Sequence, residues 1–566
     1  MDDAKTFPVS NMLDRRAFLR RALVASGGLA GASLLAACGG SSQSAPTTAP
    51  VAATTVAATG APSVATRPAG SASTGATVPA AAGAPKRGGK YTFGTGQGIT
   101  TLDPHKTSLL NDQNAFAGLW SGLVVMNEDM EPQPSLAEKW DVVDPITYLF
   151  HLRKGVKFHN GREVTADDVK FSLDLVADPA TASQLRGQSL PLYDHAEVVD
   201  PLTVKLINKS PFGPQIDALA KVMIIAKENL TDIGNKPIGT GPFQFGEFVQ
   251  DDRLVMKRFP DYWNKDNVYL DQVVIKTIKD ATALVQALKS GDVDSIWQLS
   301  TPKAQEVQSD PKLTIYRPKK NAIVQMLMLD NNQPPFNDPR ARQALSYATD
   351  RKSINDVAFF GQFIPHDYDI PMPTDNWAFD KSLPKATFDL QKAKELFDAA
   401  GVKSGTKITY QAISTANPEW VTTGEILQQS LGKIGITVEI EKLDLSAWAA
   451  IFNPPTDKIW PARIISNGNT GYSDPFFFFV TVQPGGRNFN HYGNKEAQGL
   501  LDKAASSVDR NQRMSLYAQV QQLMAKDVMC PTPYVQVGLY GVTKALKGFY
   551  AQADWVPHYE SAWLDR

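Results

Sequence analysis

The feature that most limits what this chain can fold into is a long stretch of small residues near its start. Residues 41–85 are almost wholly Ala, Thr, Ser, Pro, Gly and Val, with one charge at Arg67 and no aromatic residue. Such a composition buries too little apolar surface to offset the entropy of ordering the chain. As a coil it would span about 35–40 Å, at roughly 5–6 Å times the square root of the residue number. Folding is therefore confined to the residues from about Lys86 onward.

The residues before this stretch form the pattern of an export signal. Arg15 and Arg16 precede an uncharged run of apolar and small residues from Ala22 to Ala37. That run is shorter than the about 20 apolar residues that a membrane-spanning helix needs. A charged start, a short apolar middle and a small-residue end are typical of a secretory signal. The arginine pair indicates the twin-arginine type, but Asp14 stands where that pattern usually has Ser or Thr, which leaves the export route open.

Cys38 follows this run directly. It ends the sequence Leu-Ala-Ala-Cys, which resembles the lipobox of bacterial lipoproteins, whose cysteine thiol takes a lipid. We therefore expect residues 1–37 to be a removable signal peptide. We expect the lipid on Cys38 to anchor the chain to the outer face of the cytoplasmic membrane, with residues 38–87 as a disordered tether. Whether that face borders a periplasm or an open cell surface stays open.

The chain as a whole carries no strong charge and no cysteine framework. Its 57 basic and 58 acidic residues create no global field that would draw it to nucleic acid. If Cys38 carries a lipid, Cys530 has no disulfide partner, and its simplest role is that of a small buried apolar residue. The seven histidines form no zinc motif and no Cys/His cluster. We expect a monomer without a cofactor, a resident metal or a nucleic-acid partner.

Strand and helix patterns alternate along the part that can fold. Residues 148–153 alternate between two faces in the manner of a strand. Four residues that favour helix starts each precede an apolar stripe of helical spacing: Thr165, Asp280, Asp338 and Asp389. Gly291 and Gly401 predict the ends of two of these helices. Further helices are expected at about 419–433 and 511–527, and a further strand at 436–441. These patterns predict a mixed α/β protein.

Several segments of the folded part occur in an order that marks a known family. They are Ser135–Trp140, Phe150–Gly161, Thr165–Val169, Gly239–Phe243, Tyr262–Trp263, Leu288–Asp294, Pro335–Arg340 and Ala393–Gly401. Together they resemble the family 5 extracytoplasmic solute-binding proteins, which include oligopeptide-, dipeptide-, nickel- and some oligosaccharide-binding proteins. The resemblance implies an α/β, two-lobed periplasmic-binding-protein fold of the class II type, with an additional inserted domain, a hinge and a central ligand cleft.

The same resemblance implies how the chain divides and what it does. Lobe I would comprise residues 88–122, 205–325 and 537–566, the inserted domain residues 123–204, and lobe III residues 326–536. Closure of two lobes around a ligand is a common switching mode. The resemblance thus implies an extracytoplasmic binding lipoprotein without enzyme activity. It would deliver a small solute to the permease and ATPase subunits of an ABC importer.

One position bears on the ligand. In peptide-binding members of the family, an Asp that grips the peptide's amino group stands three residues before an acidic-Pro pair. Here that pair is Asp474-Pro475, and Gly471 stands at the expected position, with Asp474 near enough to serve instead. The neutral stretch 467–473 would also suit a sugar. A peptide or similar small solute is the first expectation and an oligosaccharide the alternative. A nickel chelate or a haem held by His491, or a solute-sensing role, are further alternatives.

Four tryptophans and one tyrosine are candidates for contact with the ligand. By the family resemblance, the regions that border the cleft hold Trp297, Trp420, Trp448, Trp460 and Tyr472. Aromatic faces can stack on sugars, on peptide side chains or on nucleobases. Any single one of them can equally be a core residue. We expect at least one member of the group to touch the ligand.

Overall fold

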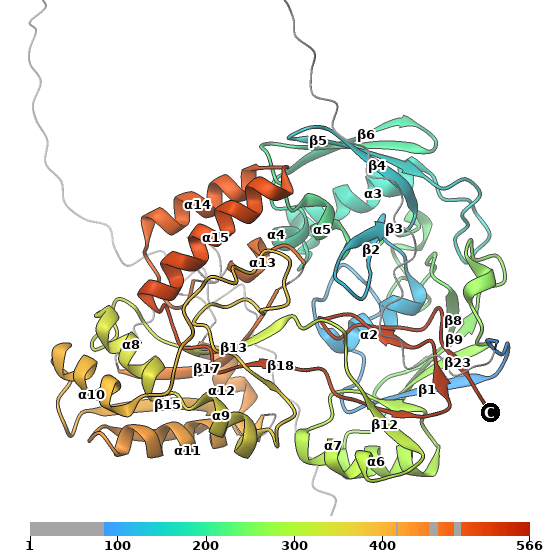
Figure 1. Ribbon diagram of the computed structural model, residues 1–566. Coiled ribbons are helices and arrows are strands. Elements are labelled where there is room, and N and C mark those ends of the chain that lie inside the picture. The colour runs from blue at the N-terminus through green and yellow to red at the C-terminus, as the bar shows by residue number, and fades with distance from the viewer. Residues whose placement is uncertain (1–83, 415–416, 452–461, 472, 480–487) are drawn as a thin grey trace, which may run out of the picture. The chain divides into compact units, whose positions relative to one another are not determined.

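The computed structural model describes residues 84–414, 417–451, 462–471, 473–479 and 488–566. The predicted export arginines Arg15 and Arg16, the predicted lipid attachment at Cys38 and most of the predicted tether lie outside these residues. Within the described part, the strands form three large β-sheets with helices around them (Figure 1). Each of these sheets packs against an apolar core of its own.

The first large sheet has β1 (Lys90–Thr95) at its centre, parallel to both of its neighbours, β10 (Gln272–Thr277) and β11 (Ser295–Ile296). Tyr91 and Phe93 lie two residues apart on one face of this pleated strand, and both are fully buried. The sheet order is β12-β19-β11-β1-β10-β9-β8, and the outer strands are β8 (Phe243–Val249), β9 (Arg253–Arg258), β12 (Leu313–Tyr316) and β19 (Tyr540–Thr543). We call this sheet and its helices lobe I.

Helix α6 of lobe I (Ala281–Ser290) begins and ends where the sequence predicts. The side chain of Asp280 accepts a hydrogen bond from the Ala283 amide and so caps the first turn. Gly291 ends the helix with a φ of +83°, a left-handed value that glycine adopts without strain. The other helices of lobe I are α2 (Leu110–Leu119) and α7 (Thr301–Gln308).

The second large sheet forms lobe III, in the order β14-β18-β13-β17-β15-β16. Its strands are β13 (Ile323–Met328), β14 (Ile364–Pro365), β15 (Lys407–Ile413), β16 (Thr437–Leu443), β17 (Arg463–Thr470) and β18 (Tyr534–Gln536). The strand predicted at 436–441 is β16, which runs parallel to β15. Every side chain of β13 is buried, so both faces of the sheet are covered at this central strand.

The helices of lobe III also start at predicted residues. Asp338 and Asp389 cap α8 (Pro339–Ala348) and α10 (Leu390–Ala399), each accepting a hydrogen bond from a first-turn amide. Gly401 follows α10 with a φ of +77°. The other helices are α9 (Arg351–Ser353), α11 (Pro418–Gly432), α12 (Leu445–Ile451), α13 (Phe476–Phe479), α14 (Lys495–Ser506) and α15 (Arg510–Asp527). Helices α14 and α15 lie side by side (Figure 1).

A four-stranded antiparallel sheet forms the inserted domain, in the order β4-β5-β7-β6. Helix α3 (Ala166–Ala177) packs on it and starts with a capping box between Thr165 and Asp168. The strands are β4 (Ala137–Asp144), β5 (Thr147–Leu152), β6 (Tyr193–Asp200) and β7 (Thr203–Asn208). Short elements complete the described part: β2 (Val124–Met126), β3 (Pro132–Pro134), α4 (Arg186–Ser189), α5 (Gln215–Leu219), β20 (Leu546–Lys547), β21 (Tyr550–Ala551), β22 (Pro557–His558) and β23 (Trp563–Leu564).

Sheet membership moves two of the predicted domain boundaries. The boundary predicted between residues 204 and 205 would cut β7, which pairs with β5 and β6 of the inserted sheet. The boundary predicted between residues 325 and 326 would cut β13, which pairs with β17 and β18 of lobe III. Backbone hydrogen bonds tie the whole length of a strand to one sheet. The chain therefore crosses between the lobes at residues 317–322 and 537–539.

Candidate ligand-binding site

Two cavities in the described structure are lined from both lobes. The Trp377 cavity, of about 360 Å³, is lined by Asp129, Met130, Glu131, Lys320, Asn321, Ala322, Asp375, Asn376, Trp377, Ser473, Phe478, Arg510 and Ala553. The Asp554 cavity, of about 250 Å³, is lined by Ser108, Leu110, Gln113, Leu185, Gly187, Gln188, Lys221, Thr470, Phe476, Phe477 and Asp554. A solute held in either cavity would touch lobe III on one side and lobe I or the inserted domain on the other.

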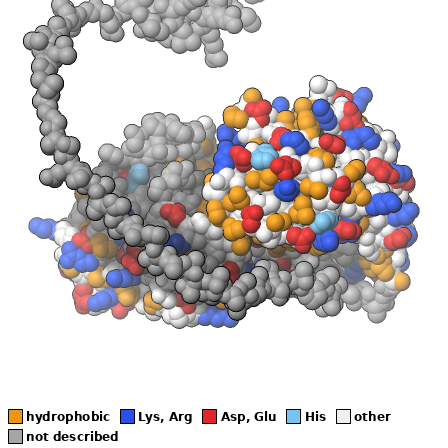
Figure 2. Space-filling model, turned by 90° about the horizontal axis from the view of Figure 1, so that it is seen from above, with side chains coloured by type: hydrophobic (Ala, Val, Ile, Leu, Met, Phe, Trp, Pro, Cys, Tyr) orange, Lys and Arg blue, Asp and Glu red, His pale blue; other side chains and the backbone are white. Residues whose placement is uncertain are grey.

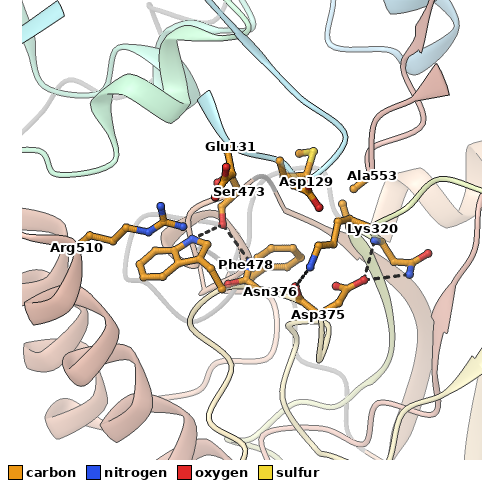
Figure 3. Close-up of a pocket in the computed structure, with 13 residues that line it drawn as sticks. Asp129, Glu131, Lys320, Asp375, Asn376, Ser473, Phe478, Arg510 and Ala553 are labelled. Carbon is orange, nitrogen blue, oxygen red and sulfur yellow. Dashed lines mark hydrogen bonds between the residues drawn. The ribbon is translucent and has the colours of Figure 1, made fainter. Parts of the chain in front are cut away.

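The aromatic wall of the Trp377 cavity is fixed in place by hydrogen bonds (Figure 3). Trp377 Nε1 and Asn376 Nδ2 both donate to the Ser473 carbonyl oxygen, at 2.9 and 3.0 Å. The Arg510 guanidinium carbon lies 4.4 Å from the centre of the Trp377 ring, in a cation–π contact. Because these contacts already order the ring, a ligand that packs on it loses little affinity to side-chain ordering.

Charged groups of both signs line the same cavity. Lys320 Nζ donates to the Asp375 carbonyl oxygen at 2.7 Å, and the Asn321 amide and Nδ2 both donate to Asp375 Oδ2 at 3.2 Å. Burial raises the pKa of Asp375 above its usual value. Asp129 and Glu131 lie above this group in Figure 3. A wall with acids and bases together suits a zwitterionic or neutral polar solute better than one with a large net charge.

Acidic and basic side chains are also intermixed on the outer surface. Figure 2 shows red and blue side chains interspersed over the described residues of the face that it presents. This distribution agrees with the 57 basic and 58 acidic residues of the whole chain. Over its described residues, this face carries no extended region of a single charge sign. A ligand would therefore be affected mainly by the individual charged side chains at the cavities.

The Asp554 cavity combines an apolar wall with a buried ion pair. Phe476 and Phe477 of α13 form the apolar side, and Phe476 meets Phe212 edge to face with ring centres 5.2 Å apart. On the lobe I side, Asp554 forms an ion pair with Lys221, and their side chains are 2% and 13% exposed. A cavity of this kind can bind a polar end and an apolar part of one solute together.

Asp474, which the sequence suggested as a ligand-binding residue, is buried and paired with residues of α15. Its carboxylate is 1% exposed and is fully used within lobe III. Oδ2 accepts a hydrogen bond from Arg513 Nε at 3.1 Å, and Oδ1 accepts one from the Tyr517 hydroxyl at 2.6 Å. Arg513 and Tyr517 are four residues apart on α15 and therefore share one face of the helix. Asp474 anchors the segment after β17 to α15 and lines neither cavity.

Packing explains why a glycine stands at position 471. A Cβ atom at this position would lie 2.5 Å from the ring of Phe478, so a side chain fits only if the ring moves. In the neutral stretch that was predicted to suit a sugar, Asn469 Nδ2 donates to the carbonyl oxygens of Pro371 and Phe478, at 2.9 and 3.0 Å. The side-chain amide nitrogen of Asn469 thus already donates its hydrogen bonds within the protein.

The predicted aromatic contacts lie in apolar cores or outside the described residues. Trp297 is 3% exposed, in the core of lobe I. Trp420 and Trp448 pack against each other, with ring centres 6.1 Å apart. None of these three lines the two inter-lobe cavities. Trp460 and Tyr472 lie outside the described residues.

The tryptophan that does line a cavity was not singled out from the sequence. Trp377 stands in a stretch between β14 and α10 that has prolines and neither helical nor strand periodicity. A large aromatic residue in such a stretch is the signal that could have identified it. Asp554 offered no comparable signal, because its partner Lys221 is 333 positions away in the chain.

His491 lies in lobe III and lines neither of the two cavities. Its Nδ1 is 2.8 Å from Asp330 Oδ1, and its φ is +51°. Among the described residues, no group of three or more His, Cys, Asp or Glu side chains could hold a metal ion. In the same part of the chain, no helix has both the length and the apolar character needed to cross a membrane. Cys530 is buried, as predicted.

Two lobes of α/β structure, an inserted domain and cavities between the lobes define the class of two-lobed solute-binding proteins. Residues 131–490 match the model of the bacterial extracellular solute-binding proteins, family 5. Since this match covers more than half of the chain, the protein belongs to that family. The family resemblance and the fold expected from it are thereby confirmed.

Individual relatives agree with this assignment. The chain is 27% identical over 482 residues to the glutathione-binding protein GsiB of Pectobacterium atrosepticum, covering 82% of this chain and 92% of that protein. The crystal structure of the ABC transporter substrate-binding protein CtaP of Listeria monocytogenes has a TM-score of 0.78 at 23% identity, covering 85% and 100%. The periplasmic binding protein DppA of Helicobacter pylori, in complex with the peptide STSA, has a TM-score of 0.71 at 25% identity, covering 85% and 99%.

Proposed function

We propose that this protein is the exported, lipid-anchored receptor of an ABC importer and that it captures a short peptide or similar zwitterionic solute between its lobes. The observation that carries this proposal is the Trp377 cavity. Its volume of about 360 Å³ falls within the range of small-molecule sites, and it presents aromatic rings and charges of both signs from two lobes. A free peptide carries an ammonium group, a carboxylate and amides, which such walls can pair.

The relatives support a peptide over the oligosaccharide alternative. GsiB is a glutathione-binding protein, and glutathione is itself a tripeptide. The DppA structure holds the peptide STSA. In this receptor the solute would bridge the lobes, and the closed form would differ in shape from the open one. A membrane permease could distinguish these forms, so no chemical step on the solute is required.

Thermal unfolding of the full-length chain in detergent, against a panel of solutes, tests the proposal. The panel holds glutathione, other peptides of two to four residues, and oligosaccharides. A solute that binds only the folded state adds about 2.7 kcal/mol of stability at a hundredfold excess over Kd. Stabilisation by peptides alone supports the proposal. Stabilisation by oligosaccharides alone would overturn the ligand class in favour of the alternative.

A further inference from the structure

Asp554 is held in its cavity by a strained turn. Trp555, in the turn 552–556, has a φ of +68°, a left-handed value that is rare for a bulky side chain. The Tyr540 hydroxyl, from β19, donates to the Trp555 carbonyl oxygen at 2.6 Å and holds the turn against the lobe I sheet. Strained backbone of this kind persists where its neighbours fix it, and it gathers at ligand sites.

The two oxygens of the Asp554 carboxylate differ in their surroundings. Oδ2 is paired with Lys221 Nζ, whereas Oδ1 is buried and has no hydrogen-bond partner within the described structure. The residue as a whole is 1% exposed. A carboxylate oxygen that leaves water without gaining a donor is costly, so native proteins rarely keep one without a function.

The neighbouring groups do not supply the missing donor. His558 interacts electrostatically with Asp554, but its Nε2 is itself buried without a hydrogen-bond partner in the described structure. Burial also lowers the pKa of His558 to about 4, so its ring brings no positive charge to Asp554 at neutral pH. Three further carboxylates line the other inter-lobe cavity: Asp129, Glu131 and Asp375. None of the three has a buried oxygen without a partner in the described part of the chain. Among the acidic side chains that line these two cavities, Asp554 is therefore the one with a buried oxygen that can accept a hydrogen bond from a bound solute.

We propose that Asp554 Oδ1 binds the protonated amino group of a solute whose remaining part lies in the Trp377 cavity, a contact that rests on the peptide-receptor function proposed above. The linings of the two cavities adjoin, since Ala553 and Phe478 line the Trp377 cavity and their chain neighbours Asp554 and Phe477 line the Asp554 cavity. An ammonium group brings a positive charge and three donors, so it satisfies Oδ1 while Lys221 keeps Oδ2. Thr470, Phe476 and Phe477 of lobe III form the opposite wall, where the first side chain of the solute would pack. The amino end would thus be recognised from lobe I. In lobe III, Gly471 has no room for a side chain and Asp474 is already paired.

Calorimetric titration of the full-length protein in detergent tests this contact with two tripeptides, trialanine and glutathione, and their N-acetylated forms. Acetylation removes the charge, so we expect the wild-type protein to bind the acetylated forms about tenfold more weakly or worse. Equal affinity for free and acetylated forms would overturn the Asp554 contact and leave the receptor function standing. Failure to bind either tripeptide in any form would overturn both.

The Asp554→Asn variant adds a second measurement. It should bind free trialanine about tenfold more weakly than the wild-type protein and bind the acetylated form about equally, so that the preference for the free amine disappears. Asp565→Asn is the matched control, since Asp565 forms an exposed ion pair with Lys86 and lines neither cavity. It should keep the wild-type preference. If Asp554→Asn fails to fold, the affinity of the wild-type protein for free trialanine, compared with its affinity for acetylated trialanine, still tests the contact.

Discussion

Arg513 Nε donates to Asp474 Oδ2 across 3.1 Å, and the two side chains are 7% and 1% exposed. This ion pair joins the segment after β17 to helix α15. Ser473, one residue earlier, offers its carbonyl oxygen to Trp377 Nε1 at 2.9 Å. The position of Trp377 in the wall of its cavity therefore depends on an ion pair whose residues do not line that cavity.

Breaking this ion pair should strongly destabilise lobe III. Asp474→Asn leaves the Arg513 charge buried without its partner, which typically costs about 3–5 kcal/mol. The free energy of unfolding in urea measures the loss. The control is Asp398→Asn, whose ion pair with Lys394 is about half exposed and should cost less than about 1 kcal/mol. A loss in Asp474→Asn no larger than in this control would contradict the structural role.

Asp217 gives the contact between α5 and lobe III a pH dependence. Burial and the nearby Asp474 carboxylate raise the pKa of Asp217 to about 6, although Ser473, Arg513 and Arg510 oppose the shift. In the unfolded chain the pKa of an aspartate is about 3.9. Between this pKa and the higher pKa of the folded state, the folded state therefore binds more protons than the unfolded state. The contribution of Asp217 to stability therefore falls as pH rises from about 4 to about 6.

The variant Asp217→Asn tests this sign. Its melting temperature should be close to that of the wild-type protein near about pH 4 and higher at neutral pH, where the wild-type carboxylate is charged. Thermal unfolding at both pH values gives the comparison. A difference between the two proteins that stays the same at both pH values would show that Asp217 does not titrate in this range.

Gly471 should not tolerate even a methyl group. In Gly471→Ala the new Cβ atom would lie 2.5 Å from the Phe478 ring, and such overpacking costs about 1–3 kcal/mol. Gly499→Ala is the matched control, because Gly499 lies inside α14 and a Cβ atom added there would have no neighbouring atom within 4 Å. Alanine there should stabilise the protein by up to about 1 kcal/mol. Urea unfolding distinguishes the two, and equal effects would contradict the packing account.

Trp377 should contribute to affinity and Trp297 to stability. Trp377→Ala removes the aromatic wall of the cavity, so we expect peptide affinity to fall about tenfold in calorimetric titration. Trp297→Phe changes a ring that is 3% exposed in the core of lobe I, so it should lower the melting temperature and leave Kd unchanged. The reverse pattern would return Trp297 to the role that the sequence suggested for it.

The lipid anchor can be tested at Cys38. Cys38→Ser removes the thiol that would take the lipid, so the variant should lose radioactive palmitate labelling and appear in the soluble extracytoplasmic fraction. Its binding of peptides should be unchanged, because residue 38 is the first residue of the predicted tether and lies outside the part of the chain that is expected to fold. Membrane attachment that persists in Cys38→Ser would show that a different segment holds the protein there.

Some features of the fold were predictable because they depend on neighbours in the chain. Asp280, Asp338 and Asp389 cap helices through amides two or three residues away, so their local sequence was sufficient. Gly291 likewise ends a helix through its own backbone freedom. The family segments added the two-lobed architecture. Two of the predicted domain boundaries would cut β7 and β13, because strand pairing extends beyond the recognisable segments.

By itself, the sequence was sufficient to recognise the family and to predict the starts of several helices. It also predicts an export region ahead of the folded body. The tertiary structure alone decided which side chains meet the cavities. Asp474 and Arg513 are 39 positions apart, and Lys221 and Asp554 are 333 positions apart. Whether a buried carboxylate is already paired or still open to a donor depends on how separate sheets and helices pack together. No local pattern of residues contains that information, because packing brings the partners together only in the folded chain.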